Sequence, residues 1–164
     1  MIYFLDTEFA PSPAGNVLIS LALVPLDGSE GRYWIMPPET WQEHVTPWVE
    51  ENVISNLFKA PFHKVLNTMK TLPFAIASYL TKAPPNRNIQ VIADWPEDIA
   101  LICRAIQTET DGGPIVPKML DNISFIFARL ESWPNNIEDA VQHNAYWDAV
   151  ALRESFLAKF EDTD

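Results

Sequence analysis

The amino-acid sequence predicts an α/β fold with a mixed central sheet. Three apolar runs with the composition of strands come first, and later apolar runs alternate with segments of helical periodicity. Strands joined by short turns pair antiparallel, whereas a strand reached through a helix pairs parallel, so both kinds of pairing are expected. A length of 164 residues with 48% hydrophobic residues suits one domain over residues 1–164.

The first 36 residues have the composition of three strands. Residues 2–9, 16–25 and 32–36 are rich in β-branched, aromatic and other apolar residues. The second run is followed by Asp27 and Gly28, a pair typical of turns. We therefore expect an antiparallel meander at the start of the domain.

The middle of the chain predicts helices around one buried strand. Residues 39–62 combine aromatic and acidic residues with weak periodicity, which indicates short helices at most. Residues 64–82 contain apolar side chains at helical spacing, with Thr71 as the candidate N-cap and Pro73 in the first turn, and lead into a proline-rich breaker at residues 83–86. The continuous apolar run at residues 88–93 predicts a buried strand, followed directly by a helix that opens at Pro96.

The C-terminal part predicts two loops and two helices. Residues 111–114 and 133–136 are rich in Gly, Pro, Asn and Asp, which indicates loops. Residues 124–130 are expected to be helical, and the last helix is expected from about residue 145 to about residue 160.

Asp6 and Glu8 form the first candidate site, at the end of the opening strand. Residues two apart in a strand project from the same face, so the two carboxylates point in one direction. Like charges held this close repel unless a cation neutralises them, and hard divalent cations prefer carboxylate oxygens. The pair indicates a metal site, although a solvated edge strand would have the same pattern.

The second candidate is a group of acids where the middle strand becomes a helix, because functional groups gather at the carboxyl ends of such strands. Asp94, Glu97 and Asp98 lie there, and each also has an ordinary role, as N-cap or as a first-turn acid that complements the helix dipole. Asp98 borders the apolar face of the predicted helix, so we expect it to be the ligand and Asp94 to be the cap. Glu97 is rotated about 100° further round and should meet solvent.

The third candidate is His143 followed by Asp148, around the start of the last helix. An acid in the first turn of a helix is fixed by packing, whereas a histidine in the preceding loop can move. This combination suits a rigid metal ligand and a mobile general base, and an unperturbed histidine pKa of about 6.5 suits a base near neutral pH. A hydrogen-bonded surface histidine would look the same in isolation.

Together and in this order, the three motifs resemble those of the DEDDh family of 3'-to-5' exonucleases. Asp-x-Glu on the first strand, an aspartate at a strand-to-helix junction and His-x4-Asp at the last helix span residues 6–148. Within that family, the opening Asp6-Thr7-Glu8-Phe9 is similar to the D-T-E-F of small stand-alone bacterial exoribonucleases. The sequence departs from the family at Glu97, where an aromatic residue usually precedes the key aspartate.

The resemblance implies an RNase H-like fold, with a mixed five-stranded sheet flanked by helices, and a homodimer. It implies a site for two divalent cations, Mg2+ or Mn2+, held by four carboxylates: Asp6, Glu8, Asp98 and Asp148. His143 would be the general base, and Thr7 and Phe9 would contact the substrate, Phe9 by stacking on a base. The implied substrate is a nucleic acid with a free 3' end, RNA in preference to DNA, and the products are nucleoside 5'-monophosphates.

Two alternatives remain open on the sequence. The formal net charge of -11 disfavours tight binding to a polyanion, although bound divalent cations reverse the local sign of a cluster of acids. A catalytically silent module that binds nucleic acid or protein fits this charge and the tryptophans at Trp41 and Trp48, but it would have no need of the five motif residues. A DNA exonuclease of the same fold is the other alternative, because the motifs do not read the 2'-hydroxyl.

The composition also bears on location. The single cysteine, Cys103, cannot form an intrachain disulfide, which fits a reducing compartment and predicts a cytoplasmic protein. No apolar run reaches the ~20 residues that a membrane helix needs. We therefore expect no membrane partner.

Overall fold

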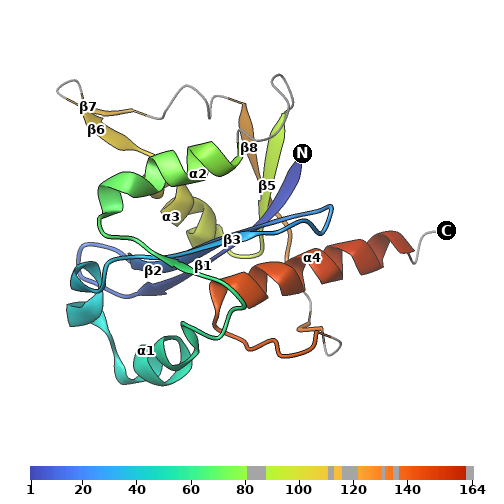
Figure 1. Cartoon of the computed structure of the whole chain (residues 1–164), viewed down its shortest axis with the longest axis horizontal. Helices are drawn as coiled ribbons and strands as arrows, with labels where there is room; N and C mark the ends of the chain where they lie inside the picture. The colour runs from blue at the N-terminus through green and yellow to red at the C-terminus, as the bar shows by residue number, and fades with distance from the viewer. Residues whose placement is uncertain (81–87, 111–112, 116–121, 131, 135–136, 162–164) are drawn as a thin grey trace.

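A six-stranded mixed sheet with helices on both faces makes up this α/β fold, as a computed structural model shows (Figure 1). The structure describes residues 1–80, 88–110, 113–115, 122–130, 132–134 and 137–161. The strand order is β4-β3-β2-β1-β5-β8. The strands of this sheet are β1 (Ile2–Ala10), β2 (Val17–Pro25), β3 (Arg32–Ile35), β4 (Lys64–Val65), β5 (Ile89–Ala93) and β8 (Ile123–Phe127).

The helices form a layer on each face of the sheet. In Figure 1, α2 and α3 lie on one side of the strands, and the long α4 lies on the other. The α-helices are α1 (Pro47–Asn52), α2 (Leu72–Leu80), α3 (Pro96–Ala105) and α4 (Ala145–Glu161). The 3-10 turns are η1 (Pro38–Thr40), η2 (Gln42–His44), η3 (Ile54–Asn56) and η4 (Met69–Thr71), and a separate ladder pairs β6 (Thr108–Thr110) with β7 (Gly113–Ile115).

The predicted antiparallel meander is confirmed for β1, β2 and β3. Its second turn, between β2 and β3, contains Gly28 at φ 75°, a left-handed conformation that glycine adopts without steric cost. Between β1 and β2 the register shifts beyond Glu8, because Phe9 pairs with Leu18 and leaves Ile19 as an extra residue. Such a bulge bends the strand and increases its twist.

The end of β5 creates an open edge on β1. The two strands run parallel from the pair Ile2 and Gln90 to the pair Leu5 and Ala93. There β5 ends, whereas β1 continues to Ala10. The stretch of β1 that starts at Asp6 therefore keeps β2 on one side and meets the turn from β5 into α3 on the other.

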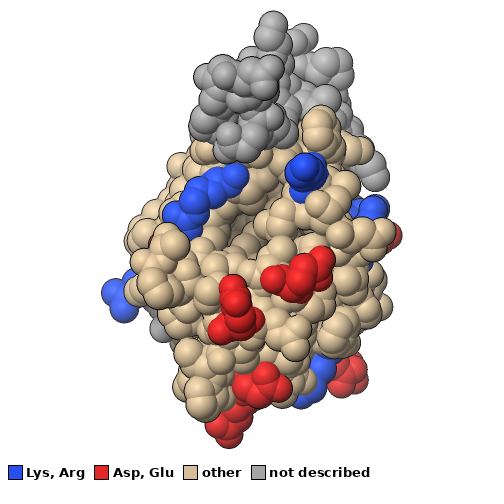
Figure 2. Space-filling view, turned by 90° about the vertical axis from the view of Figure 1, so that its left-hand side faces the viewer, with Lys and Arg blue, Asp and Glu red and all other residues tan. Residues whose placement is uncertain are grey.

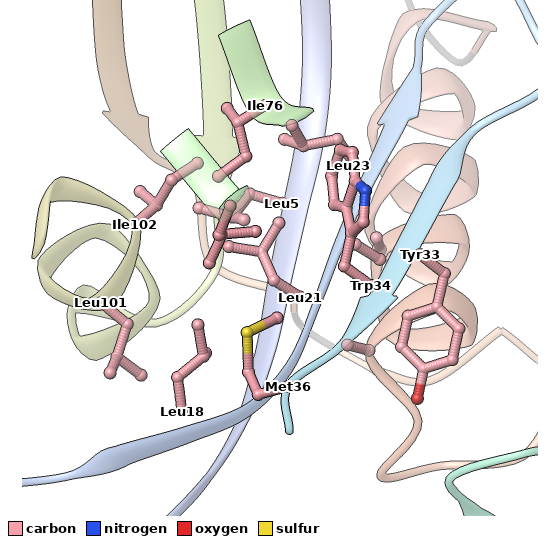
Figure 3. Close-up of a cluster of buried hydrophobic side chains, with 14 of the residues drawn as sticks. Leu5, Leu18, Leu21, Leu23, Tyr33, Trp34, Met36, Ile76, Leu101 and Ile102 are labelled. Atoms are coloured by element: carbon pink, nitrogen blue, oxygen red, sulfur yellow. The ribbon is translucent and has the colours of Figure 1, made fainter. Parts of the chain in front are cut away.

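The main hydrophobic core joins the sheet to α2 and α3 on one face and also includes residues of α1 and α4. Figure 3 shows Leu5 and Leu21 of the strands meeting Ile76 of α2 and Ile102 of α3, and all four side chains are buried. Burial of apolar area of this kind is the main favourable term in folding. It holds the end of β1 and the start of α3 rigidly beside each other.

Two expectations from the sequence are wrong. Residues 124–130 are not helical, because Ile123–Phe127 forms β8, which pairs in parallel with the whole of β5. Within the expected loop at residues 111–114, the described residues Gly113 and Pro114 belong to β7. By contrast, the helix expected within residues 64–82, with Thr71 as its N-cap, is confirmed, because α2 begins at Leu72.

The sixth strand comes from that same segment. Lys64–Val65 forms β4, which pairs in parallel with the end of β3 and gives the sheet six strands, where the resemblance implies five. A strand of two residues has no detectable periodicity of its own, so only its pairing reveals it. The expected breaker at residues 83–86 lies outside the described residues, as do residues 135–136 of the second expected loop.

The helices next to the candidate residues begin where the sequence predicts. Pro96 occupies the first turn of α3, and α4 starts at Ala145. The segment from residue 39 to residue 62 contains short helical turns and one six-residue α-helix, as expected. Among the described residues, no helix is long and apolar enough to cross a membrane.

Candidate metal centre

Five carboxylates from β1, the turn after β5, α3 and α4 gather at the open edge of β1. One carboxylate oxygen from each of Asp6, Asp94 and Asp98 lies within 4.8 Å of the other two, and the same holds for Asp6, Glu8 and Asp148. Asp6 belongs to both groups and therefore lies between them. The structure thus brings together all four carboxylates that the sequence predicts as ligands, and it adds Asp94.

Asp6 and Glu8 project together because they are two positions apart on β1. Their antiparallel partners on β2 are Ala22 and Ser20, small residues that leave room for the carboxylates. Burial raises the pKa of each carboxyl well above its ordinary value and is the largest cause of the shift. The charges of the neighbouring acids raise the pKa further. Proximity and burial together thus favour protons or cations on this pair.

Asp98 is held by the backbone and the side chain of Thr7. The Thr7 N–H and hydroxyl donate to Oδ1 of Asp98, at 3.2 Å and 2.5 Å. The N–H lies on the edge of β1 that β5 no longer covers, so the carboxylate takes the place of a strand partner. Asp98 is only 2% exposed, and burial raises its pKa to about 7 although both hydrogen bonds from Thr7 lower it.

Asp148 is oriented by the start of α4. Its Oδ2 accepts a hydrogen bond from the Asn144 N–H at 3.1 Å. Burial raises the pKa of Asp148 to about 7, while hydrogen bonds from Glu8 and from the backbone lower it. A hydrogen bond to Asp148 also raises the pKa of Glu8, as expected for two carboxyls that share one proton.

Two buried oxygens of the cluster have no hydrogen-bond partner among the described residues. They are Oδ2 of Asp6 and Oδ2 of Asp98. A buried carboxylate oxygen without a partner costs free energy unless a proton or a cation occupies its lone pairs. An all-oxygen donor set with such free positions suits a hard divalent cation such as Mg2+ or Mn2+.

The expectation that Asp94 caps α3 is wrong. Trp95 occupies the N-cap position and makes no side-chain capping hydrogen bond. Asp94 instead lies within the group of Asp6 and Asp98. Glu97 is turned away from this group and makes a 2.9 Å ion pair with Arg104 at the surface of α3.

His143 lies immediately before α4 but belongs to neither carboxylate group. Its backbone is left-handed, with φ 59°, a conformation that is uncommon for a residue other than glycine and that its surroundings must stabilise. The ring lies edge-on against Trp48 of α1, with the two ring centroids 5.1 Å apart. The preceding carbonyl, of Gln142, accepts a hydrogen bond from the Asn56 side chain at 3.0 Å.

Asn144 is a positioning residue that the sequence analysis missed. It is fully buried, and its Oδ1 caps α4 by accepting from the Tyr146 N–H at 3.2 Å. Its Nδ2 donates to the Asn56 carbonyl at 2.8 Å, which ties the start of α4 to the segment after α1. An asparagine directly before an apolar helix is an N-cap signal, and that signal could have identified it.

The two residues expected to contact substrate differ in their surroundings. Thr7 is buried, and its hydroxyl is engaged by Asp98. Phe9 is partly buried and packs against the main core. The most exposed aromatic side chain near the carboxylates is instead Trp95, which is 61% exposed beside Asp94 and which the sequence analysis did not single out.

No protein-family model matches this chain, and no curated protein matches it. The residues and the geometry of the site are therefore the basis for a function.

Proposed function

We propose that this protein is a metal-dependent 3'-to-5' exonuclease that releases nucleoside 5'-monophosphates, with RNA as the favoured substrate. One observation carries the proposal: two groups of three carboxylates share Asp6 at the open edge of β1. Enzymes that hydrolyse phosphodiesters by the two-metal mechanism need two adjacent sites of this kind, with a bridging ligand between them.

The residues present fit two divalent cations. Asp6, Glu8 and Asp148 would hold one cation, and Asp6 with Asp98 would hold the other, where Asp94 offers a further oxygen. When bound, such cations neutralise charge on the phosphate and increase the acidity of the attacking water. The roles left to the side chains of the protein are to orient the phosphate, to remove a proton from the attacking water and to exclude competing reactants.

His143 is the proposed general base. His143 directly precedes Asn144, whose N–H donates to Asp148, so the chain itself brings the proposed base near the group of Asp6, Glu8 and Asp148. The edge-on contact with Trp48 limits where the imidazole can turn. Its role is to accept the proton of the attacking water at a ring nitrogen.

The RNase H-like fold belongs to this proposal and is supported by the topology. An antiparallel meander, β1 to β3, is extended on the β1 side by two parallel strands, β5 and β8, with helices on both faces. These five strands form a mixed sheet of the kind that the motif resemblance implies. The two-residue β4 is an addition at the far edge.

An acidic chain can still bind a polyanion where its charges are segregated. Residues 52–93 contain five of the 11 lysines and arginines and no aspartate or glutamate. Figure 2 shows a face of the molecule on which Lys and Arg border a central hollow from above and Asp and Glu border it from below, with further Lys and Arg toward the left and lower edges. Local positive potential, rather than net charge, governs the attraction of phosphates.

Incubation of the purified protein with 5'-end-labelled single-stranded RNA and DNA tests the proposal. With Mg2+ or Mn2+ we expect a ladder that shortens from the 3' end, faster on RNA, and no cleavage in EDTA. His143→Ala should slow cleavage by roughly a hundredfold or more, the usual scale for loss of a general base. Degradation of DNA alone would support the DNA exonuclease instead, and binding without cleavage under all metal conditions would support the silent module.

A further inference from the structure

An open pocket adjoins the carboxylates on the side of Asp94. It has a volume of about 650 Å3, and its lining includes Asp94, Trp95, Phe127 and Arg129. Asp94 also belongs to the group with Asp6 and Asp98, so this one residue lies both in the pocket lining and in the carboxylate cluster. The lining comes from the turn between β5 and α3 and from the end of β8.

Two aromatic side chains in this pocket expose most of their surface. Trp95 is 61% exposed and Phe127 is 53% exposed, although large apolar side chains are usually buried. They are close neighbours, because Phe127 pairs with Ala93, two residues before Trp95. Exposed aromatic faces beside a basic side chain are the elements with which proteins bind single-stranded nucleic acids.

The charges of the pocket also suit a nucleotide. Glu97 is engaged by Arg104 at 2.9 Å, which offsets one of its negative charges. Arg129 is exposed and has no ion-pair partner among the described residues. A guanidinium in this state is free to bind a phosphate with two hydrogen bonds.

The reaction geometry identifies which nucleotide would lie there. In an in-line displacement, the attacking and leaving oxygens lie on opposite sides of the phosphorus. His143 and Asp148 mark the side of the attacking water in the proposed function, so the leaving oxygen faces Asp94 and Asp98. Release of a nucleoside 5'-monophosphate from a 3' end makes that leaving oxygen the 3'-oxygen of the penultimate nucleotide.

We infer that this pocket binds the penultimate nucleotide of the substrate, with its base on Trp95 and Phe127 and its phosphate at Arg129. The inference rests on the proposed exonuclease function and extends it with a subsite on the polymer side of the scissile bond. The subsite explains how an enzyme with a small, acidic metal centre can hold the retained strand rather than only the departing monomer.

A coupling experiment between protein and substrate tests the subsite. The substrates are two oligonucleotides of the polymer that the protein degrades, one intact and one abasic at the penultimate position. Stacking on an aromatic side chain contributes about 1–3 kcal/mol, so the parent should cleave the abasic substrate roughly 5- to 150-fold less efficiently in kcat/KM. Trp95→Ala should lose a similar factor on the intact substrate and should no longer distinguish the two.

Matched variants separate stacking from general damage. Phe74 on α2 is 60% exposed and lies outside this pocket, so Phe74→Ala should behave like the parent on both substrates. Trp95→Phe keeps an aromatic face and should recover most of the discrimination. Arg129→Gln should raise KM on both substrates without removing the effect of the base.

The outcomes separate this inference from the proposed function. If the parent cleaves but Trp95→Ala still distinguishes the substrates as the parent does, the subsite is wrong and the exonuclease stands. If the parent cleaves neither RNA nor DNA, fluorescence anisotropy with a 5'-fluorescein oligonucleotide decides. Weaker binding by Trp95→Ala, but not by Phe74→Ala, would then retain the pocket as a nucleotide site, and equal binding by all three proteins would overturn it.

Discussion

Thr7 couples the first strand to Asp98, the proposed ligand of the second cation. Its N–H and hydroxyl both donate to one oxygen of Asp98, so the other oxygen of that carboxylate remains available. Both hydrogen bonds lower the pKa of Asp98, which burial raises to about 7. Thr7 therefore fixes the direction of the carboxylate and favours its charged form.

Removal of the hydroxyl should weaken cation binding more than folding. In Thr7→Val, Asp98 keeps the backbone donor and loses the side-chain donor, so its pKa rises further and a cation must displace a more tightly held proton. A hydrogen bond to a charged group contributes about 1.5–3 kcal/mol, so the Mg2+ concentration for half-maximal activity should rise about tenfold or more. Thr7→Ser keeps the hydroxyl, so its Mg2+ requirement should be close to that of the parent. Equal Mg2+ requirements in all three proteins would exclude the coupling.

The sequence predicts that the carboxylates of Asp6 and Glu8 point in one direction, because the two-residue period of a strand places them on one face whatever surrounds the strand. It does not predict Asp94 as a member of the cluster, since an aspartate before a helix has the same local pattern as an N-cap and as a ligand. Only the position of β1 relative to that turn decides between the two. The contact between His143 and Trp48 is likewise not predictable from the sequence, because α1 and α4 are far apart in the chain and only the fold brings them together.

At the scale of elements, the site depends on where β5 stops. Because β5 ends opposite Leu5, the turn into α3 lies beside Asp6 rather than continuing the ladder. Pro96 in the first turn of α3 starts the helix at once, and Asp98 follows on its buried side. The three acids of this junction consequently have different surroundings despite lying within five residues.

Substitutions at this junction should separate the three acids. Asp98→Asn keeps an acceptor for Thr7 but loses the charge, so cleavage should stop while stability in EDTA changes little. Asp94→Asn should lower activity and should not lower stability, because Asp94 caps no helix. Glu97→Gln should be nearly silent, since a surface ion pair contributes at most about 1 kcal/mol.

Cleavage of end-labelled RNA measures the effects on activity, and thermal melts in EDTA measure the effects on stability. Full activity in Asp98→Asn together with no activity in Asp94→Asn would move the second ligand from α3 to the end of β5. A large loss in Glu97→Gln would contradict the orientation of α3.

A helix or strand can be predicted from the sequence where its pattern of residues is long. It is missed where only pairing with a neighbouring strand defines it. The nine-residue strands β1 and β2 and the 17-residue helix α4 are long segments with the composition of a strand or of a helix throughout. The run Ile123–Phe127 is short and apolar, which suits either a buried helix or a strand, and its pairing with β5 settles the matter. The edge strand β4 has too few residues to carry any signal.

At the scale of the whole molecule, the acidic cluster should make stability depend on pH and metal together. Burial raises the pKa of Asp6, Glu8, Asp94, Asp98 and Asp148, the last two to about 7. Ordinary values for these groups are about 4, so between pH 4 and pH 7 the folded protein holds more protons than the unfolded chain. Stability without metal is therefore greatest at the acidic end of this range and falls as pH rises through 7.

Divalent cations should reverse this trend, because they bind only the deprotonated carboxylates. In thermal melts at pH 5.5, 7 and 8.5, we expect the Tm in EDTA to decrease with pH and the increase on adding Mg2+ to grow with pH. At a hundredfold excess over Kd, one bound cation contributes about 2.7 kcal/mol, and each kcal/mol raises the Tm of a domain this size by about 2 to 4 °C. Asp6→Asn removes the carboxylate shared by both groups, so it should be at least as stable as the parent in EDTA at pH 8.5 and should lose most of the Mg2+ response. A Mg2+ response that is equal at pH 5.5 and 8.5, or that persists in Asp6→Asn, would show that the cation binds elsewhere.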